Sequence, residues 1–300
     1  MKKIKNLEKA VLLLLLLCSV TMMDAQTQEV PLKVRFFCTN WGMTDTWDAF
    51  CERVKTAGFD GVETWLPADG PQLEEMEAAL EKHGLQLILL SAGSGKTFDA
   101  YLANFVDNLE RAVARHPVLV NCHTGKDHFT FAQNKALIDA ATAISEDSGV
   151  EVVHETHRGR FSFAAHITKT YLEALPDLSL ALDISHWCNV HESMLADQPE
   201  AVELALRRTR HIHARIGHTQ GPQVNDPRAP EWEGVVEQHV QWWDSVVEHQ
   251  RQQGNATLTI TTEFGPPTYM PVLPYTRQPV ADQWVINQYM LKQLKARYTQ

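Results

Sequence analysis

Eight short runs rich in β-branched, aromatic and other apolar residues recur along the chain, and stretches with the apolar spacing of amphipathic helices separate them. The runs begin near positions 34, 61, 85, 118, 150, 178, 211 and 257. Most of these starts are about 25 to 35 residues apart, which is the length of a strand, a helix and two short connections. Eight such units in a chain of 300 residues predict an α/β protein, and they fit a closed (β/α)8 barrel better than an open sheet.

Helices are expected in the intervals between the runs, over 46–57, 72–83, 98–116, 129–148, 164–175, 199–210, 231–253 and 279–298. Gly58 and Gly84 follow the first two helices, and glycine readily takes the positive φ that ends many helices. The longest irregular stretches, 219–230 and 265–278, each follow a run and precede a helix, which places them on the barrel face that carries active sites. No linker or change of composition marks a second domain, so we expect one barrel domain over 26–300.

The N-terminus has the pattern of a secretory signal peptide. Three lysines within the first five residues precede an apolar block over 10–20, and Ala25 follows at the expected cleavage site. The block is too short to span a bilayer comfortably, and no later segment is long enough. We therefore expect a signal peptide over 1–25 and export to the periplasm. Cys18 leaves a lipoprotein open, although Leu17 stands where a lipidation motif has a small residue.

Charge limits the kind of ligand. The formal net charge is -10, which argues against a nucleic-acid partner because such binding relies on basic surface. A small polar or weakly charged ligand fits better.

Four cysteines follow the expected signal peptide, and no CxxC or zinc-ribbon spacing relates them, so we expect thiols buried in the core: Cys38, Cys51, Cys122 and Cys188.

Alternation along the runs indicates which side chains face the barrel interior. Successive residues of a strand point to opposite faces, so one alternate set packs against helices and the other faces inward. In the stretch HIHARIGH at 211–218, the isoleucines form the apolar set, which leaves His211, His213 and Arg215 inward. Carboxylates with the same parity stand at the C-terminal ends of three other strands: Glu155, Asp183 and Glu263.

Four strands thus bring a carboxylate or an imidazole to one mouth of the barrel. Converging carboxylates repel one another, and a bound divalent cation is the simplest explanation for their presence there. The expected ligands are Glu155, Asp183, His213 and Glu263. Three oxygen donors and one nitrogen favour Mn²⁺, Mg²⁺ or Co²⁺, and Zn²⁺ is also compatible.

Five segments carry these residues and their neighbours: GFDGVETW, VEVVHETHRGR, LALDISHW, HIHARIGH and TITTEFGP. Together they resemble the xylose isomerase-like TIM barrel superfamily, the sugar isomerase and epimerase group that includes the ketose 3-epimerases. The resemblance covers nearly all of the mature chain. It implies one divalent metal ion on the four ligands named above, and it implies that His186, which completes an Asp-x-x-His pattern with Asp183, binds a substrate oxygen.

The resemblance further implies an isomerase or epimerase of carbohydrate metabolism that moves a proton next to the carbonyl of a keto-sugar. Glu155 and Glu263 would flank the reacting carbon, one removing the proton and the other returning it. Arg215 and His123 are expected to hold hydroxyls or the developing oxyanion. Further substrate-binding candidates are Glu63, Lys126, His157, Arg158 and His218, for which ordinary polar loop roles remain open. Three tryptophans offer either a face for the sugar ring or core packing: Trp41, Trp65 and Trp187.

Other functions stay open beside the isomerase. A sugar lyase or dehydratase would use the same chemistry next to the carbonyl. A phosphodiester hydrolase similar to endonuclease IV would need more zinc ligands and a basic groove, and a sugar-binding protein would bind without turnover. The sequence leaves open the sugar, the metal and the oligomeric state, a homo-oligomer included.

Overall fold

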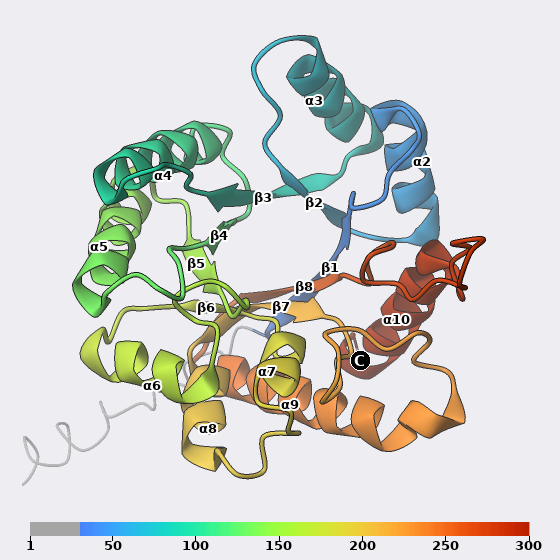
Figure 1. Ribbon diagram of the computed structural model, residues 1–300. Helices are drawn as coiled ribbons and strands as arrows, with labels where there is room; N and C mark the ends of the chain where they lie inside the picture. Colours follow the sequence, from blue (N-terminus) through green and yellow to red (C-terminus); the bar gives the residue numbers. More distant parts are fainter. Residues whose placement is uncertain (1–30, 300) are drawn as a thin grey trace, which may run out of the picture. The chain divides into compact units, whose positions relative to one another are not determined.

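The computed structural model describes residues 31–299. The expected signal peptide over 1–25, Cys18 and the expected start of the barrel at 26 lie outside these residues. Eight parallel strands close into a barrel in chain order, and helices surround it (Figure 1). This confirms the predicted (β/α)8 barrel. The strands are β1 (Lys33–Thr39), β2 (Gly61–Trp65), β3 (Gln86–Ala92), β4 (Val120–His123), β5 (Val152–Glu155), β6 (Leu180–Leu182), β7 (Thr209–Ala214) and β8 (Thr257–Thr262).

Each expected helix is present, with ends that differ by a few residues from those predicted. The helices are α2 (Trp47–Ala57), α3 (Pro71–His83), α4 (Phe98–Val113), α5 (Phe131–Ser148), α6 (Ala165–Ala174), α8 (Pro199–Arg207), α9 (Glu233–Gln252) and α10 (Gln283–Tyr298). Two short elements were not predicted: helix α7 (Ser185–Val190) and a 3-10 turn at Pro230–Trp232. The predicted helix ends at Gly58 and Gly84 are confirmed, because both glycines have a positive φ, of 93° and 59°.

Two apolar layers support the barrel. The outward side chains of the strands pack against the ring of helices. Inside, a small cluster that includes Phe37, Ile88, Val153 and Ala181 fills the barrel beneath the polar residues. Gly61 belongs to this inner layer, and a Cβ there would lie 2.5 Å from the Phe37 ring. This inner apolar cluster therefore closes the barrel below its C-terminal mouth.

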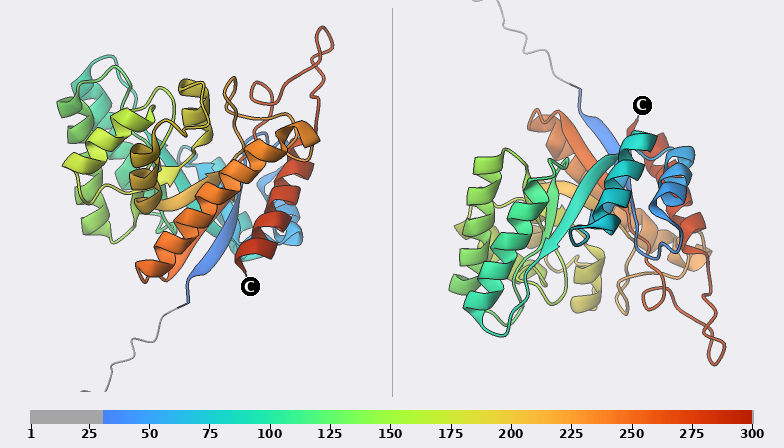
Figure 2. Two further views of the ribbon diagram at one scale, coloured as in Figure 1. Left: turned by 90° about the horizontal axis from the view of Figure 1, so that it is seen from below. Right: turned by 90° about the horizontal axis from the view of Figure 1, so that it is seen from above.

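The connections at the C-terminal ends of the strands form the mouth. The loop after β8 is long, and Figure 2 shows that it projects away from the barrel.

The four cysteines within the described residues are all buried and free, as predicted. No helix between residues 31 and 299 is both long enough and apolar enough for a bilayer crossing.

Candidate active site

A cavity of about 420 Å³ opens at the mouth of the barrel. It is lined by Thr39, Asn40, Trp41, Gly42, Trp65, Leu90, His123, Glu155, His157, Arg215, Glu263 and Tyr269. Seven of the residues singled out from the sequence are in this wall: Trp41, Trp65, His123, Glu155, His157, Arg215 and Glu263. Ligand pockets combine apolar walls with a few converging polar groups in this way.

The four expected metal ligands converge on the imidazole of His213. Glu155, Asp183 and His213 each offer a ligand atom, and these atoms lie within 4.8 Å of one another. The Nδ1 atom of His213 is 3.6 Å from Glu155 Oε2 and 2.9 Å from Glu263 Oε2. The alternation along four separate strands therefore brings these groups to one place.

Two atoms of this group suit a cation in particular. His213 Nδ1 and Glu263 Oε2 are buried, and neither has a hydrogen-bond partner with suitable geometry although they are 2.9 Å apart. Buried polar atoms seldom stay unpaired, and a bound cation would give both of these atoms a partner. Three carboxylates and one imidazole are donors that Mn²⁺, Mg²⁺ or Co²⁺ accept. The residues present thus fit a divalent cation.

Electrostatics at His213 point the same way. Burial alone would lower the pKa of His213, but the carboxylates of Glu263 and Glu63 raise it well above its ordinary value. For Glu155 the effects have the opposite sign. Burial alone would raise the pKa of this carboxyl, but His123 and His213 hold it well below its ordinary value. Negative charge is therefore concentrated around one imidazole, and such a field favours a divalent cation.

Glu63 influences which nitrogen of His213 carries the proton and which nitrogen is left for the cation. It is 1% exposed, and its Oε1 lies 2.9 Å from His213 Nε2. A carboxylate at Nε2 favours a proton on that nitrogen, which leaves the lone pair of Nδ1 free for a metal ion. The amide of Asn121 supports the arrangement, because its Nδ2 donates to Glu155 Oε2 at 2.9 Å. Glu63 itself, one of the substrate-binding candidates, is not among the residues that line the cavity.

Asp183 is held by its own neighbours. Arg215 Nη2 forms an ion pair with Asp183 Oδ2, and the hydroxyl and backbone N–H of Ser185 donate to Asp183 Oδ1. Burial raises the pKa of Asp183 to about 6 although Arg215 lowers it, and Glu263 adds to the rise. Arg215 Nη1 also lies 3.5 Å from Glu263 Oε2, so one guanidinium neutralises part of the charge of both carboxylates.

Three histidines lie next to one another beside Glu155: His123, His157 and His186. His123 Nε2 is 2.9 Å from Glu155 Oε2. The His157 ring lies 4.8 Å from that of His123 and 4.0 Å from that of His186 between ring centroids. Burial lowers the pKa of His157 to about 3 and that of His186 well below its usual range, so both imidazoles are neutral. Glu155, His157 and His186 also form a second cluster with metal-ligand spacing.

The remaining sequence candidates lie around the cavity. The His186 imidazole is fully buried behind the lining and lies 3.5 Å from Asp183 Oδ2. The Lys126 ammonium lies 5.8 Å from the Tyr101 ring, and the His218 ring packs on Trp232 at 4.8 Å.

The aromatic candidates divide between two roles. Trp41 and Trp65 line the cavity, whereas Trp187 is fully buried in the core and donates from Nε1 to the backbone oxygen of Ser162.

Five residues that line the cavity were not predicted from the sequence: Thr39, Asn40, Gly42, Leu90 and Tyr269. Tyr269 lines the cavity, and its ring lies 4.7 Å from the Arg215 guanidinium and 5.0 Å from that of Arg158. It comes from the irregular loop after β8, where no periodicity indicates direction. Alternation does place Asn121 on the inner face of β4 together with His123, but it indicates no role for the amide.

Comparisons with known proteins agree with this architecture. The family model described as xylose isomerase-like TIM barrel matches residues 51–264. The 3-keto-D-glucoside 4-epimerase YcjR of E. coli has a TM-score of 0.57 at 14% identity, over 88% of this chain and 100% of its own. The probable 3-DHS dehydratase AsbF of Bacillus anthracis, involved in petrobactin synthesis, has a TM-score of 0.59 at 14% identity, over 87% and 98%.

A family 2 AP endonuclease of Brucella melitensis has a TM-score of 0.55 at 16% identity, over 78% of this chain and 93% of its own. At these identities the likeness to solved structures shows a common fold. No curated protein matches the chain. Since the family model covers most of the barrel, from α2 to the end of β8, the chain belongs to the xylose isomerase-like TIM barrel family.

Proposed function

We propose that the protein is a divalent-metal-dependent sugar epimerase or isomerase that moves a proton next to a carbonyl. One observation carries the proposal: Glu155 and Glu263 both line the cavity and both approach His213 Nδ1. Two carboxylates from different strands therefore reach the same small volume. Epimerisation needs two such groups, one that accepts a proton and one that returns a proton to the other face.

In this mechanism Glu155, Asp183, His213 and Glu263 would hold the cation. When bound, it would polarise the carbonyl and a neighbouring hydroxyl of the substrate. Glu155 is the better-defined base, because His123 Nε2 and Asn121 Nδ2 each lie 2.9 Å from its Oε2 and orient it. The rings of Trp41, Trp65 and Tyr269 offer apolar faces to the sugar and keep water from the reacting carbon.

The test is proton exchange with solvent. Purified protein with Mn²⁺ is incubated in D₂O with a panel of keto-sugars, both neutral and acidic, and deuterium is located by NMR. We expect deuterium at the carbon next to the carbonyl, and at least a hundredfold loss of exchange in Glu155→Gln, which keeps the side-chain shape but not the base. Absence of exchange across the panel in the wild type contradicts the proposal. Binding that Glu155→Gln leaves unchanged, without turnover, would instead favour a sugar-binding protein.

A dehydratase is the second candidate. Elimination needs a group that protonates the departing hydroxyl, and His123 lines the same cavity beside Glu155. The likeness to the probable dehydratase AsbF is compatible with this reaction. Mass spectrometry separates the two outcomes, because dehydration removes one water and epimerisation leaves the mass unchanged.

A phosphodiester hydrolase would need more than one metal ion per chain. Within residues 31–299, three overlapping groups have ligand spacing, and one of them comprises Glu63, His211 and His213. The AP endonuclease with the same fold makes metal analysis worthwhile. One ion per chain supports the epimerase, and three zinc ions per chain would favour phosphodiester hydrolysis.

We also propose that the protein is exported to the periplasm. The support is the sequence of residues 1–25 alone. Expression of the full chain followed by cell fractionation should give a periplasmic product whose N-terminus lies near Ala25. A lipidated Cys18 would instead place the product in the membrane fraction.

A further inference from the structure

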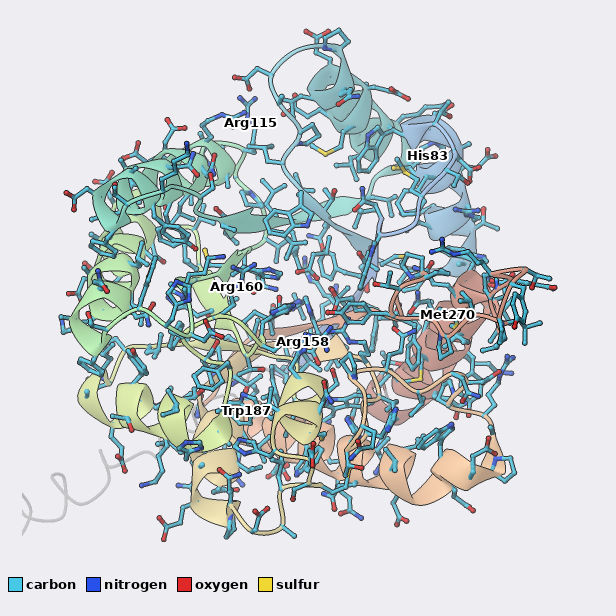
Figure 3. All side chains as sticks on the ribbon, in the orientation of Figure 1. His83, Arg115, Arg158, Arg160, Trp187 and Met270 are labelled. Atoms are coloured by element: carbon cyan, nitrogen blue, oxygen red, sulfur yellow. The ribbon has the colours of Figure 1, made fainter. Side chains whose placement is uncertain are left out.

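Two cations at the mouth of the barrel lack an acidic partner. Lys126 and Arg160 are both half-buried, and within residues 31–299 no carboxylate oxygen lies within 4.0 Å of either charged group. Figure 3 shows Arg160 near the centre of the barrel, whereas Arg115 lies among the outer helices. Charged groups that are partly withdrawn from water usually have a partner. Neither forms an ion pair within residues 31–299, although the protein carries a net charge of -10.

The guanidinium of Arg160 has donors to spare. Its Nε is buried and has no hydrogen-bond partner. Its Nη2 contacts His123 Nδ1 at 3.5 Å, which is a long and weak bond. A guanidinium offers five N–H donors in a planar fork that matches the oxygens of a carboxylate or a phosphate. Most of that capacity is unused here.

Lys126 lies in a turn near it, because the backbone N–H of Phe161, which follows Arg160, donates to the backbone oxygen of Thr124 at 3.3 Å. Asn134 accepts from the backbone N–H of Lys126 at 3.3 Å and donates to its backbone oxygen at 3.0 Å. Gly125 precedes it with a φ of 63°, and a Cβ there would lie 2.0 Å from Asn134 Oδ1, so the turn requires glycine. Burial and the charge of Arg160 lower the pKa of the Lys126 ammonium, and the neighbouring carboxylate of Asp127 raises it. The fold therefore holds two like charges together.

His123 connects this pair to the reacting groups. Its Nε2 lies 2.9 Å from Glu155 Oε2, and its Nδ1 faces Arg160. Arg160 is therefore linked to Glu155 through the imidazole ring of His123.

We propose that Lys126 and Arg160 form a subsite for an oxyanion carried by the substrate, either a carboxylate or a phosphate. The substrate would then be an acidic sugar, with its anionic end at Arg160 and its carbonyl near Glu155. This rests on the proposed function only for the carbonyl end, because the subsite itself is a binding feature. An anion there would satisfy the free donors of Arg160 and relieve the repulsion between the cations.

The test compares neutral and acidic partners by isothermal titration calorimetry with Mn²⁺-loaded protein. Glucose is paired with glucuronate in one arm and with glucose 6-phosphate in the other, so that the arms distinguish a carboxylate from a phosphate. We expect at least one acidic sugar to bind about tenfold or more tightly than glucose, which is the gain of one charge-assisted contact. Equal affinity within both pairs, absence of binding included, would overturn the proposal.

Variants separate this subsite from direct binding of anions to the metal. Arg160→Gln and Lys126→Gln should each reduce the preference for the acidic sugar at least fivefold while the affinity for Mn²⁺ is unchanged. Arg160→Lys should retain part of the preference. The matched control is Arg115→Gln, which removes one positive charge on α4's C-terminal side, where Arg115 pairs with Glu77 at 3.2 Å, and it should leave both affinities unchanged. A preference that survives in Arg160→Gln and Lys126→Gln contradicts the subsite.

The outcome is independent of the exchange experiment. If acidic sugars bind through Arg160 but no sugar exchanges deuterium, the epimerase fails and the subsite stands. If neutral sugars exchange deuterium with no preference for acidic ones, the epimerase stands and the subsite fails.

Discussion

At the scale of single residues, one buried carboxylate contacts the site without lining the cavity. Glu63 contacts His213 Nε2 at 2.9 Å and His211 Nε2 at 3.2 Å from its two oxygens. Burial alone would raise its pKa, but His213 and His211 hold it well below the ordinary value. It is therefore ionised and orients the histidine above it.

Replacing Glu63 tests this positioning role. Glu63→Gln keeps the shape of the side chain but removes the charge that fixes the proton of His213. We expect the affinity for Mn²⁺ to fall by about 10- to 100-fold, as is typical when the group behind a metal-ligating histidine is changed. Titration calorimetry with Mn²⁺ measures the effect. Glu173→Gln, which alters an exposed glutamate on α6, serves as control, and equal affinities in the two variants would show that Glu63 has no such role.

Two glycines give a matched test of the barrel interior. At Gly61 a Cβ would lie 2.3 Å from the backbone oxygen of Gln86, whereas at Gly234 nothing lies within 4 Å. Gly61→Ala should therefore lower the free energy of unfolding by about 1–3 kcal/mol through overpacking. Gly234→Ala, within helix α9, should be neutral or raise it by up to about 1 kcal/mol. Urea unfolding measures the free energy of unfolding of both variants. Equal changes in the two variants would contradict the close packing at Gly61.

At the scale of elements, alternation along the strands predicted much of the site. The period of two placed Glu155, His213 and Glu263 on the inner face without knowledge of the loops, because strand geometry is local. The same rule did not reach Tyr269 or the short helix α7, since the path of a loop depends on contacts with distant segments. It also gave no sign that Lys126 would share the mouth with Arg160, because that meeting joins the loops after β4 and β5.

Helix α9 is tied to the loop after β7 by one neutral histidine. His239 donates from Nδ1 to the backbone oxygen of Val235 at 2.9 Å and accepts at Nε2 from the N–H of Gly217 at 3.2 Å. Burial lowers the pKa of His239 from 6.5 to about 4. Protonation of Nε2 would place two N–H groups against each other, so the folded state excludes the proton.

The sign of the pH effect follows from this pKa. Between pH 6.5 and about 4 the unfolded chain binds the proton and the folded chain does not, so stability falls as the pH falls through this window. The loss from this group would reach about 3 kcal/mol. Urea unfolding at pH 7, 6 and 5 should show a steeper decline in the wild type than in His239→Gln, whose amide keeps a donor and an acceptor but does not titrate. Parallel declines would contradict the assignment.

At the scale of the whole molecule, a metal ion that contacts four strands should stabilise the barrel. The proposed ligands come from the ends of β5, β6, β7 and β8, which are neighbours in the closed sheet. An ion that binds only the folded state, at 100 times its dissociation constant, adds about 2.7 kcal/mol. We expect Mn²⁺ to raise the melting temperature by roughly 5 °C and EDTA to reverse the rise. The rise should vanish in His213→Gln, and a wild type that does not respond to Mn²⁺ would rule out the site.

The four free cysteines have a consequence for the conditions under which the chain can mature. Burial raises the pKa of the Cys38 thiol to about 12 and that of Cys51 to about 11, so neither is a reactive thiolate at neutral pH. The barrel over residues 31–299 closes without any sulfur cross-link. Dithiothreitol should therefore leave the melting temperature unchanged, and a drop would reveal a cross-link. We therefore expect the barrel over residues 31–299 to refold in a reducing buffer as well as in an oxidising one.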